Sequence, residues 1–357
     1  MKKILGAVAV AAVLAPSFAA AQSDVTLYGR ADASYNYRSF GSTPTVGTTV
    51  GKPDTHYSSV SSDTSYWGIV GKEDLGNGRK AYFKMENGFN IDTGAQVSPT
   101  TLFNREAYVG LGDSAIGSIQ LGSQFGPSVA LTGEADPFLR SNLGGNPTLF
   151  QNGPATTRGY TLKYDNAIQY LSPTTNAVSV RALVSLGEGT IPGPNYAGLV
   201  KYSKGPLMVG TTYDRNRILA TSVGLTGVTV TSQTLSLAAK YAVGFGTLNA
   251  FALTNRIPGL PHANGYALGA TVLAGPGEIR TSVARQDVGT GKGTLGAIGY
   301  FYLISKRTTL YAAAGRLTNQ GTAIFSMAPT VGESTAAGLP GKGQNINGAS
   351  LGMRAFF

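Results

Sequence analysis

Near its N-terminus the chain alternates apolar and polar residues with a period of two. In VTLYGRADASYNYR, Val25, Leu27 and Tyr35 fall on one face of an extended strand, and Arg30 and Asp32 fall on the other. Successive side chains of a strand point to opposite faces, so this pattern predicts a strand with one apolar and one polar face. The run is about twice the average length of a soluble strand, whereas a tilted strand that crosses a membrane needs about 9–11 residues.

The same kind of segment recurs along the chain. The pattern predicts about sixteen strands, at 25–38, 65–75, 79–90, 101–112, 117–124, 159–172, 177–188, 195–204, 206–216, 235–244, 247–256, 263–274, 277–288, 293–304, 307–318 and 345–357. Short connections rich in Gly, Pro and Asn alternate with longer ones, which include 41–64, 125–158, 217–234 and 319–344. An even number of antiparallel strands with both termini on the short-turn side is typical of an outer-membrane barrel.

The properties of a bilayer explain why the two faces differ. In lipid every backbone polar group must be bonded within the protein, so a membrane sheet has to close and leave no edge. About sixteen strands enclose a lumen too wide for side chains to fill, so polar faces line water and apolar faces contact lipid. The predicted fold is therefore all-β, a 16-stranded antiparallel transmembrane β-barrel with short periplasmic turns and long external loops.

The first residues have the features of a secretory signal peptide. Lys2 and Lys3 form a positive n-region, and the apolar run that follows is too short to span a bilayer. Ala19, Ala20 and Ala21 form a small-residue cleavage site. We therefore expect a signal peptide at 1–21 and one barrel domain at 22–357.

Composition argues against several other classes of protein. Removing the two lysines of the signal peptide from 28 basic residues leaves 26 against 18 acidic residues, a net charge of +8. The basic residues are spread over many strands, so we expect no nucleic-acid partner. The chain has no cysteine, and His56 and His262 fall in or beside predicted external loops, so we expect no metal site. Without a Gly-x-Ser-x-Gly motif we expect neither an enzyme nor a cofactor.

Four segments carry a family signal, in chain order AQSDVTLYGRADASY, SYWGIVGKEDLGNGRKAYFKME, NREAYVGLGDSAIGSIQLGSQFG and YDNAIQYLSP. Together with the signal peptide and the terminal Phe357, they resemble the trimeric general porins of Gram-negative bacteria, the β-proteobacterial branch most closely. The resemblance runs from the mature N-terminus to about residue 173 and returns in the last strand.

This resemblance implies partners and a location. It implies a homotrimer in the outer membrane that contacts lipid, lipopolysaccharide and the barrel-assembly machinery, and that passes small hydrophilic solutes and ions. It also implies that the third loop, in 125–158, folds into the lumen and narrows it. Phe357 resembles the signal that the assembly machinery reads, although a terminal aromatic residue also fits an interfacial girdle.

The resemblance further implies a field across the narrowed lumen, because basic wall residues face acidic loop residues in the family. The expected basic wall comprises Arg30, Lys80, Lys84, Arg105, Lys163 and Arg181. The expected acidic side of the loop comprises Glu134 and Asp136. Alternation does not decide the fourth strand, because Arg105 shares a face with apolar residues and Glu106 shares a face with Tyr108.

Two positions depart from the family pattern. Tyr66 stands where relatives often have an arginine before the Trp-Gly pair, and Ser123 stands where an arginine often precedes the third loop. Both changes remove positive charge from the expected wall, so we expect only a mild anion preference. The prediction is a general diffusion porin. A substrate-specific porin of the same fold is the main alternative, and an outer-membrane adhesin or structural barrel is a remote one.

Overall fold

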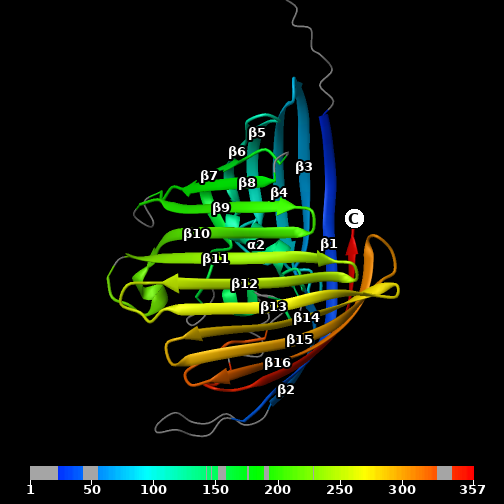
Figure 1. Ribbon diagram of the computed structural model, residues 1–357, viewed down its shortest axis with the longest axis vertical. Coiled ribbons are helices and arrows are strands. Elements are labelled where there is room, and N and C mark those ends of the chain that lie inside the picture. The colour runs from blue at the N-terminus through cyan, green and yellow to red at the C-terminus, as the bar shows by residue number, and fades with distance from the viewer. Residues whose placement is uncertain are drawn as a thin grey trace, which may run out of the picture.

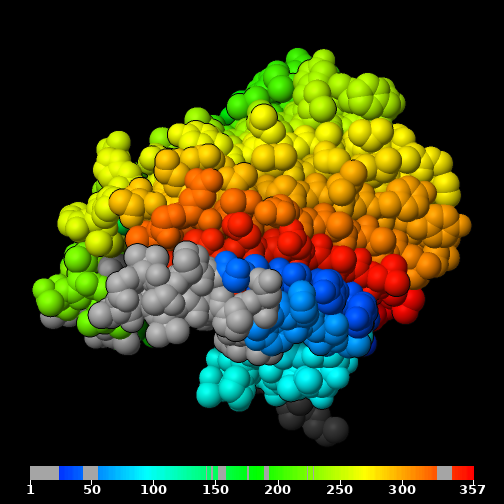
Figure 2. Space-filling model, turned by 90° about the horizontal axis from the view of Figure 1, so that it is seen from below, coloured from blue at the N-terminus to red at the C-terminus, as the bar shows by residue number. Residues whose placement is uncertain are grey.

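One antiparallel β-sheet that closes on itself forms the molecule. The structure, a computed structural model, describes residues 23–42, 55–141, 143–145, 147–151, 158–174, 177–188, 193–227, 229–327 and 340–357. Seventeen strands of this part form a continuous series in which the first pairs with the last (Figure 1). In Figure 2 the C-terminal strand (red) lies beside the N-terminal strand (blue) along this seam. The predicted signal peptide lies outside the described residues and stays a prediction.

The elements follow one another in simple chain order. The strands are β1 (Ser23–Phe40), β2 (Thr55–Ser62), β3 (Ser65–Gly76), β4 (Arg79–Phe89), β5 (Glu106–Asp113), β6 (Gly117–Phe125), β7 (Lys163–Leu171), β8 (Val178–Ser185), β9 (Asn195–Lys204), β10 (Leu207–Leu219), β11 (Thr229–Val243), β12 (Gly246–Arg256), β13 (Ala263–Ala274), β14 (Gly277–Val288), β15 (Gly291–Leu303), β16 (Thr308–Gln320) and β17 (Ile346–Phe356). The helices of the described part are α2 (Pro127–Ala135), α3 (Pro147–Phe150) and the 3₁₀ helix η1 (Ala220–Val223). No helix of the described ranges is long and apolar enough to cross a membrane.

The barrel has sixteen strand positions, which we call staves, and two consecutive strands, β2 and β3, share the second one. For this reason seventeen strands form sixteen staves. One half of β1 pairs with β2 and the other half pairs with β3. Asp63 and Thr64 separate these two strands, and Thr64 has a φ of 62°, which is unusual for a β-branched residue. The predicted 16-stranded antiparallel barrel is confirmed. The predicted loop 41–64 is too long, because its second half is the strand Thr55–Ser62.

The alternating pattern sorts side chains to the two faces as predicted. Leu27 and Leu268 point outward and are 61% and 67% exposed, whereas Asp32 and Asp214 point inward and are fully buried. Short turns join the strands at one rim, which we call the short-turn end, and the longer connections lie at the other rim, the loop end. For example, Asn77 and Gly78 alone separate β3 from β4, and both have positive φ angles that suit a tight hairpin turn.

The largest departures from the predicted strand bounds lie at three places. The strand predicted at 101–112 begins only at Glu106, because Asn104 turns its side chain back to accept the N–H of Gly88 at 2.7 Å. The strand predicted at 159–172 begins at Lys163, because the N–H of Tyr160 is bonded to Phe150 instead of to a neighbouring strand.

The third correction concerns the connection predicted at 217–234. β10 continues to Leu219 and β11 begins at Thr229, and these two residues are cross-strand partners. The hairpin therefore extends further toward the loop end than the sequence pattern indicates. Thr and Ser residues interrupt the apolar alternation there, since that part of β11 reads TVTSQT.

Candidate functional site in the barrel lumen

The segment 126–162, which we call L3, follows β6, and its described residues leave the wall and lie inside the barrel. α2 begins the loop with Pro127 in the first turn, where a proline's missing N–H breaks no helical hydrogen bond. α2 contacts β9, β10, β11 and β12, so it lies against their inner faces (Figure 1). The third loop therefore folds into the lumen, as the sequence predicts.

α2 is in close contact with the wall through apolar packing and hydrogen bonds. Leu131 is fully buried, and a Cβ atom on Gly210 would lie 2.5 Å from Leu131 Cδ1. The glycine thus provides the space that the leucine fills. The hydroxyl of Ser128 donates to Asp214 Oδ2 at 2.7 Å and lies 2.9 Å from Thr212 Oγ1. One face of α2 is in this way joined to one wall of the barrel.

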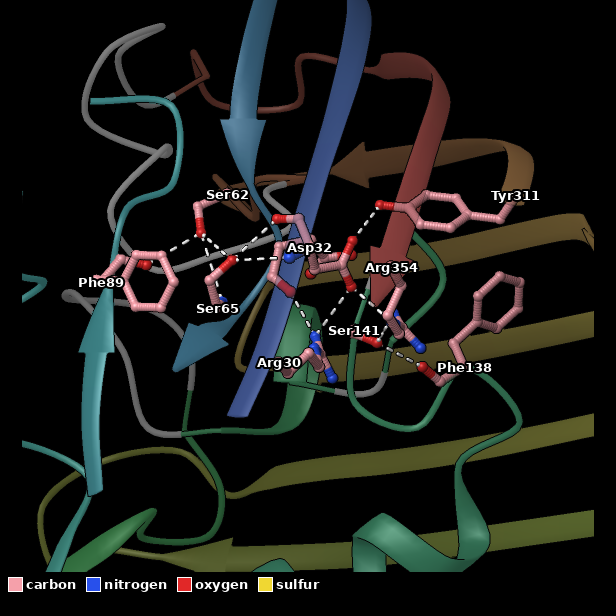
Figure 3. A network of polar contacts seen from close by, with 10 residues as sticks. Arg30, Asp32, Ser62, Ser65, Phe89, Phe138, Ser141, Tyr311 and Arg354 are labelled. Carbon is pink, nitrogen blue, oxygen red and sulfur yellow. Dashed lines mark hydrogen bonds and ion pairs between the residues drawn. The ribbon is translucent and has the colours of Figure 1, made fainter. Parts of the chain in front are cut away.

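The tip of L3 is a turn that is held from both sides (Figure 3). Asp136 is buried, and its carboxylate accepts the backbone N–H groups of Phe138 at 3.0 Å and Arg140 at 3.1 Å. The ring of Phe138 packs edge-on against Phe301 of β15, with centroids 6.0 Å apart. The hydroxyl of Ser141 accepts from Arg354 Nη2 at 3.0 Å.

The returning part of L3 continues along the same wall. The ring of Phe150 in α3 packs on Phe251 of β12, with centroids 5.4 Å apart. The hydroxyl of Thr234 donates to the carbonyl of Gly159 at 2.8 Å, and Arg158 donates to the carbonyl of Pro261. Burial lowers the pKa of the Arg158 guanidinium, but arginine stays protonated in proteins.

The opposite wall carries a network of paired charges on β1, β4 and β5. Lys84 Nζ lies 2.5 Å from Glu106 Oε2 and 3.3 Å from Glu86 Oε2. Arg105 Nε lies 2.6 Å from Glu86 Oε1, and the hydroxyl of Tyr28 donates to Glu86 Oε2 at 2.6 Å. Two cations and two carboxylates therefore compensate one another here.

The position of Arg105 resolves the ambiguity of the fourth predicted strand. Glu106 pairs in register with Glu86, so the Glu106 face of β5 is the inner face. Arg105 precedes the first residue of β5, where alternation no longer fixes the direction of a side chain. Its guanidinium lies 4.6 Å from the ring centroid of Tyr66 and 5.2 Å from that of Phe125. Tyr66 thus contributes a π face to the wall at the place of an expected positive charge.

A second charged network lies at the seam where β1 meets β17 (Figure 3). Asp32 is fully buried and accepts from Arg354 Nε at 2.6 Å and from the hydroxyl of Tyr311 at 2.7 Å. Arg30 Nη2 lies 3.3 Å from the same carboxylate and also donates to the carbonyl of Asp63. Through Arg354 this network continues into Ser141 at the tip of L3.

The other expected cations lie in different surroundings. Lys80 is exposed near the short-turn end, 5.4 Å from the ring centroid of Tyr82. Arg181 lies on the inner face of β8, opposite the buried Leu199. Lys163 lies 3.0 Å from Asp165, whose side chain is 63% exposed, so this pair stands apart from the buried networks.

The expected acidic side of L3 has a different arrangement from the one predicted. Glu134 Oε1 lies 2.6 Å from Lys201 Nζ of β9, the wall on which L3 is docked. Asp136 accepts backbone N–H groups within its own turn. Neither carboxylate has a described ion pair with Lys84 or Arg105. Instead, wall carboxylates pair with the wall cations.

Sequence reasoning missed several residues of these networks. They are Asp32, Glu86, Glu106, Lys201, Tyr311 and Arg354. The sequence held a partial signal, because Asp32 and Arg354 occupy polar faces of the first and last strands, which must adjoin in a closed barrel. The described residues contain no group of three or more His, Asp or Glu side chains that could hold a metal ion.

A closed sixteen-stave barrel with a loop folded inside defines a channel of the outer-membrane type. Residues 7–322 match the model of the Gram-negative porin family, and the chain belongs to this family. It is 28% identical over 373 residues to an outer membrane porin of Bordetella pertussis, covering 87% of this chain and 93% of that protein. It is 27% identical over 375 residues to outer membrane porin protein 32 of Delftia acidovorans, covering 100% of both chains.

Solved structures show the same fold. An anion-selective porin from Comamonas acidovorans superposes with a TM-score of 0.78 and 24% identity, covering 94% of this chain and 100% of that chain. The outer membrane protein OmpT of Vibrio cholerae, in its trimer form, superposes with a TM-score of 0.62 and 14% identity, covering 94% and 99%. The chain is therefore an outer-membrane porin, and the predicted family, fold and location are confirmed.

Proposed function

We propose that the chain forms a water-filled diffusion channel for small hydrophilic solutes and ions, with a mild preference for anions. The observation that carries this proposal is the position of L3, which is docked along one inner wall while the opposite wall presents paired charges. Sixteen staves enclose a lumen that side chains cannot fill, so a docked loop narrows a passage that stays hydrated. Diffusion through such a passage needs no catalytic group and no cofactor.

The constriction in this proposal lies between L3 and the network of Lys84, Glu86, Arg105 and Glu106. The two cations of this network are compensated by two carboxylates, so the network adds little net field. Without the two lysines of the predicted signal peptide, the chain carries a net charge of +8, and this excess favours anions inside a lumen. The anion-selective porin from Comamonas acidovorans has the same fold.

Assembly as a homotrimer is part of the proposal, and it is supported by the trimer form of the Vibrio cholerae structure. Phe357 fits the proposed role of an assembly signal. Its backbone exchanges two hydrogen bonds with Gly29, at 3.0 and 3.1 Å, and the residue remains 51% exposed. An assembly machinery can therefore reach the ring while the final strand is already in register. Outer-membrane lipid and lipopolysaccharide are the other proposed partners.

The test is single-channel recording in a planar bilayer, with a KCl gradient and a panel of sugars as blockers. We expect large ohmic steps in groups of three, a reversal potential of the sign that anion preference gives, and no sugar that blocks at low concentration. Small steps blocked by one sugar would instead identify a substrate-specific porin. If folded protein gives no current steps, the proposed channel function is wrong, and an adhesin or structural barrel becomes the better interpretation.

A further inference from the structure

Tyrosine side chains project into the lumen from the strands that face L3. We call them the tyrosine row, and they are Tyr28 of β1, Tyr66 of β3, Tyr82 of β4 and Tyr108 of β5. Leu27 and Val109, which are chain neighbours of two of these tyrosines, point outward and are 61% and 59% exposed. Because successive residues of a strand point to opposite faces, the tyrosines beside them point inward. The other two rings meet these edge-on, with centroids 6.3 and 6.4 Å apart, so all four lie on the inner face.

The tyrosine row extends from the proposed constriction toward the short-turn end. Tyr66 lies at the level of the constriction, where the guanidinium of Arg105 contacts its ring. In the sheet register Tyr82 pairs with Lys72, which is six residues nearer the short-turn end than Tyr66 on the same strand. A strand rises about 3.3 Å per residue, so the row covers about 20 Å of wall along the strand direction. A solute on this side of the lumen therefore meets aromatic rings over most of the barrel below the constriction.

Glycines of β5 allow two side chains of β4 to lie flat against the wall. A Cβ atom on Gly110, the cross-strand partner of Tyr82, would lie 2.7 Å from Tyr82 Cε2. A Cβ atom on Gly112 would lie 3.0 Å from Cε of Lys80, its own cross-strand partner. The ring of Tyr82 therefore lies across β5, and the ring of Tyr108 stands at 88° to it. The two rings form an inner corner with two aromatic sides, which we call the aromatic corner.

The aromatic corner has a cation beside it whose charge is not compensated by an ion pair in the described part of the chain. Lys80 Nζ lies 5.4 Å from the ring centroid of Tyr82, near the outer limit of a cation–π contact. Its cross-strand partner Asp74 accepts the N–H of Gly76 at 2.9 Å. Lys84, by contrast, is paired with two carboxylates. The ammonium of Lys80 is therefore available to an anionic group on a solute that rests on the ring.

We propose that Lys80, Tyr82 and Tyr108 form a weak binding site for planar aromatic carboxylates of the benzoate class that diffuse through the lumen. The ring of such a solute stacks on Tyr82 and meets Tyr108 edge-on, which are the two favoured geometries of aromatic pairs. Its carboxylate accepts a hydrogen bond from the ammonium of Lys80. The rest of the tyrosine row continues the aromatic wall to the constriction. The inference rests on the proposed channel function and names a class of solute that the channel favours.

The first experiment measures equilibrium binding by saturation-transfer NMR, with folded full-length protein in detergent micelles. The probes are benzoate, which is planar, and cyclohexanecarboxylate, which has the same charge and a puckered ring. The wild type should bind benzoate about threefold or more tighter than cyclohexanecarboxylate. Tyr82→Leu/Tyr108→Leu keeps apolar side chains but removes the rings, and it should lose this difference. The matched control, Tyr202→Leu/Tyr241→Leu, should keep the difference, because these tyrosines are 40% and 48% exposed on the outer face at the same end.

Further variants test the site even if the leucine variant does not fold. Tyr82→Phe/Tyr108→Phe retains both rings and should restore the preference for benzoate. Lys80→Gln should weaken benzoate binding about two- to fivefold and leave the binding of uncharged benzyl alcohol unchanged. Equal binding of benzoate and cyclohexanecarboxylate by the wild type would overturn the site. Maltose that displaces benzoate at equal concentration would also overturn it, because a sugar would then be the ligand.

A channel measurement separates this inference from the proposed function. Reversal potentials with benzoate on one side of a planar bilayer and chloride on the other give relative permeabilities, and the same is done with cyclohexanecarboxylate. The wild type should pass benzoate about twofold more readily than cyclohexanecarboxylate, and the leucine variant should pass both equally. Wild-type channels without this preference would overturn the role of the site in permeation. Protein that binds benzoate but gives no current steps would support the site and reject the channel alone.

Discussion

The wall that carries L3 and the wall that faces it follow the same alternating pattern with different chemistry. On β10 the inner residues beneath α2 are Gly210, Thr212 and Asp214, and their contacts with L3 are apolar packing and hydrogen bonding with the hydroxyl of Ser128. On β4 and β5 the inner residues are charged and paired with one another. Beneath α2 the first wall presents one carboxyl group, Asp214, which accepts from Ser128, whereas docking on the second wall would remove water from four charged side chains at a cost in free energy.

The difference teaches that L3 docks on the wall where fewer charged side chains must lose water. Glu134 agrees with this, because its carboxylate pairs with Lys201 of β9 while the buried residues of α2 carry no charge. Lys84 and Arg105 pair with carboxylates of their own wall, and the predicted opposition of basic wall and acidic loop stays a prediction. A channel of this kind should discriminate ions weakly.

The largest expected effect comes from removing the docked loop. Deletion of residues 128–150 should raise single-channel conductance about twofold or more, because the deleted part occupies the lumen of a wide barrel. Conductance is measured in a planar bilayer on protein that migrates as a folded barrel in unheated gels. If the folded deletion protein conducts like the wild type, L3 does not narrow the passage.

The next effect concerns the packing of α2. Leu131→Ala removes a fully buried side chain and should destabilise the docked state by about 2–4 kcal/mol. We expect noisier open-channel current and a lower temperature of heat-induced unfolding. Leu235→Ala, at a position 44% exposed on the outer face of β11, is the matched control and should change neither. Equal behaviour of the two variants would show that α2 is not packed against this wall.

A smaller effect is expected from the charged wall. Arg105→Ala leaves Glu86 with one cation fewer, so the reversal potential under a KCl gradient should shift toward cation preference. Arg105→Lys keeps the charge but loses the planar contact with Tyr66, and it should restore most of the ion preference. An unchanged ion ratio in the alanine variant would remove Arg105 from the constriction.

The smallest effect is expected at Lys163. Its ammonium lies 3.0 Å from the exposed carboxylate of Asp165, and exposed pairs contribute only about 0–1 kcal/mol. Lys163→Ala should therefore leave conductance and reversal potential within experimental error of the wild type. A shift as large as that of Arg105→Ala would place Lys163 at the constriction.

The strand pattern predicted the barrel well because burial on one face repeats every second residue. The bounds of 263–274 and 277–288 were predicted without error for β13 and β14. The predicted strand bounds were wrong where a side chain takes the place of strand pairing, as Asn104 does at Gly88. They were also wrong where polar residues continue a hairpin beyond the apolar part of the strands, as at Thr229.

The candidate site was less predictable, because its partners are far apart in the chain. Asp32 and Arg354 are 322 positions apart and meet only because the barrel closes between β1 and β17. Arg105 points into the lumen, but it lies just before the first residue of β5, where the alternation of a strand does not predict the direction of a side chain. The sequence indicates Asp136 as part of the acidic side of the loop, but it gives no sign that its carboxylate accepts two backbone N–H groups of its own turn.

The central claim is that α2 lies on the inner face of β10, and a disulfide tests it most directly. Ser128 Oγ and Thr212 Oγ1 lie 2.9 Å apart, and the chain has no cysteine of its own. In folded Ser128→Cys/Thr212→Cys protein we expect oxidation to form the cross-link, detected by mass spectrometry of digested protein, with conductance close to that of the wild type. The pair Ser128→Cys/Val209→Cys should not cross-link, because Val209 faces outward and is 43% exposed. Absence of the first cross-link, or a large change in conductance when it forms, would contradict the docked position of L3.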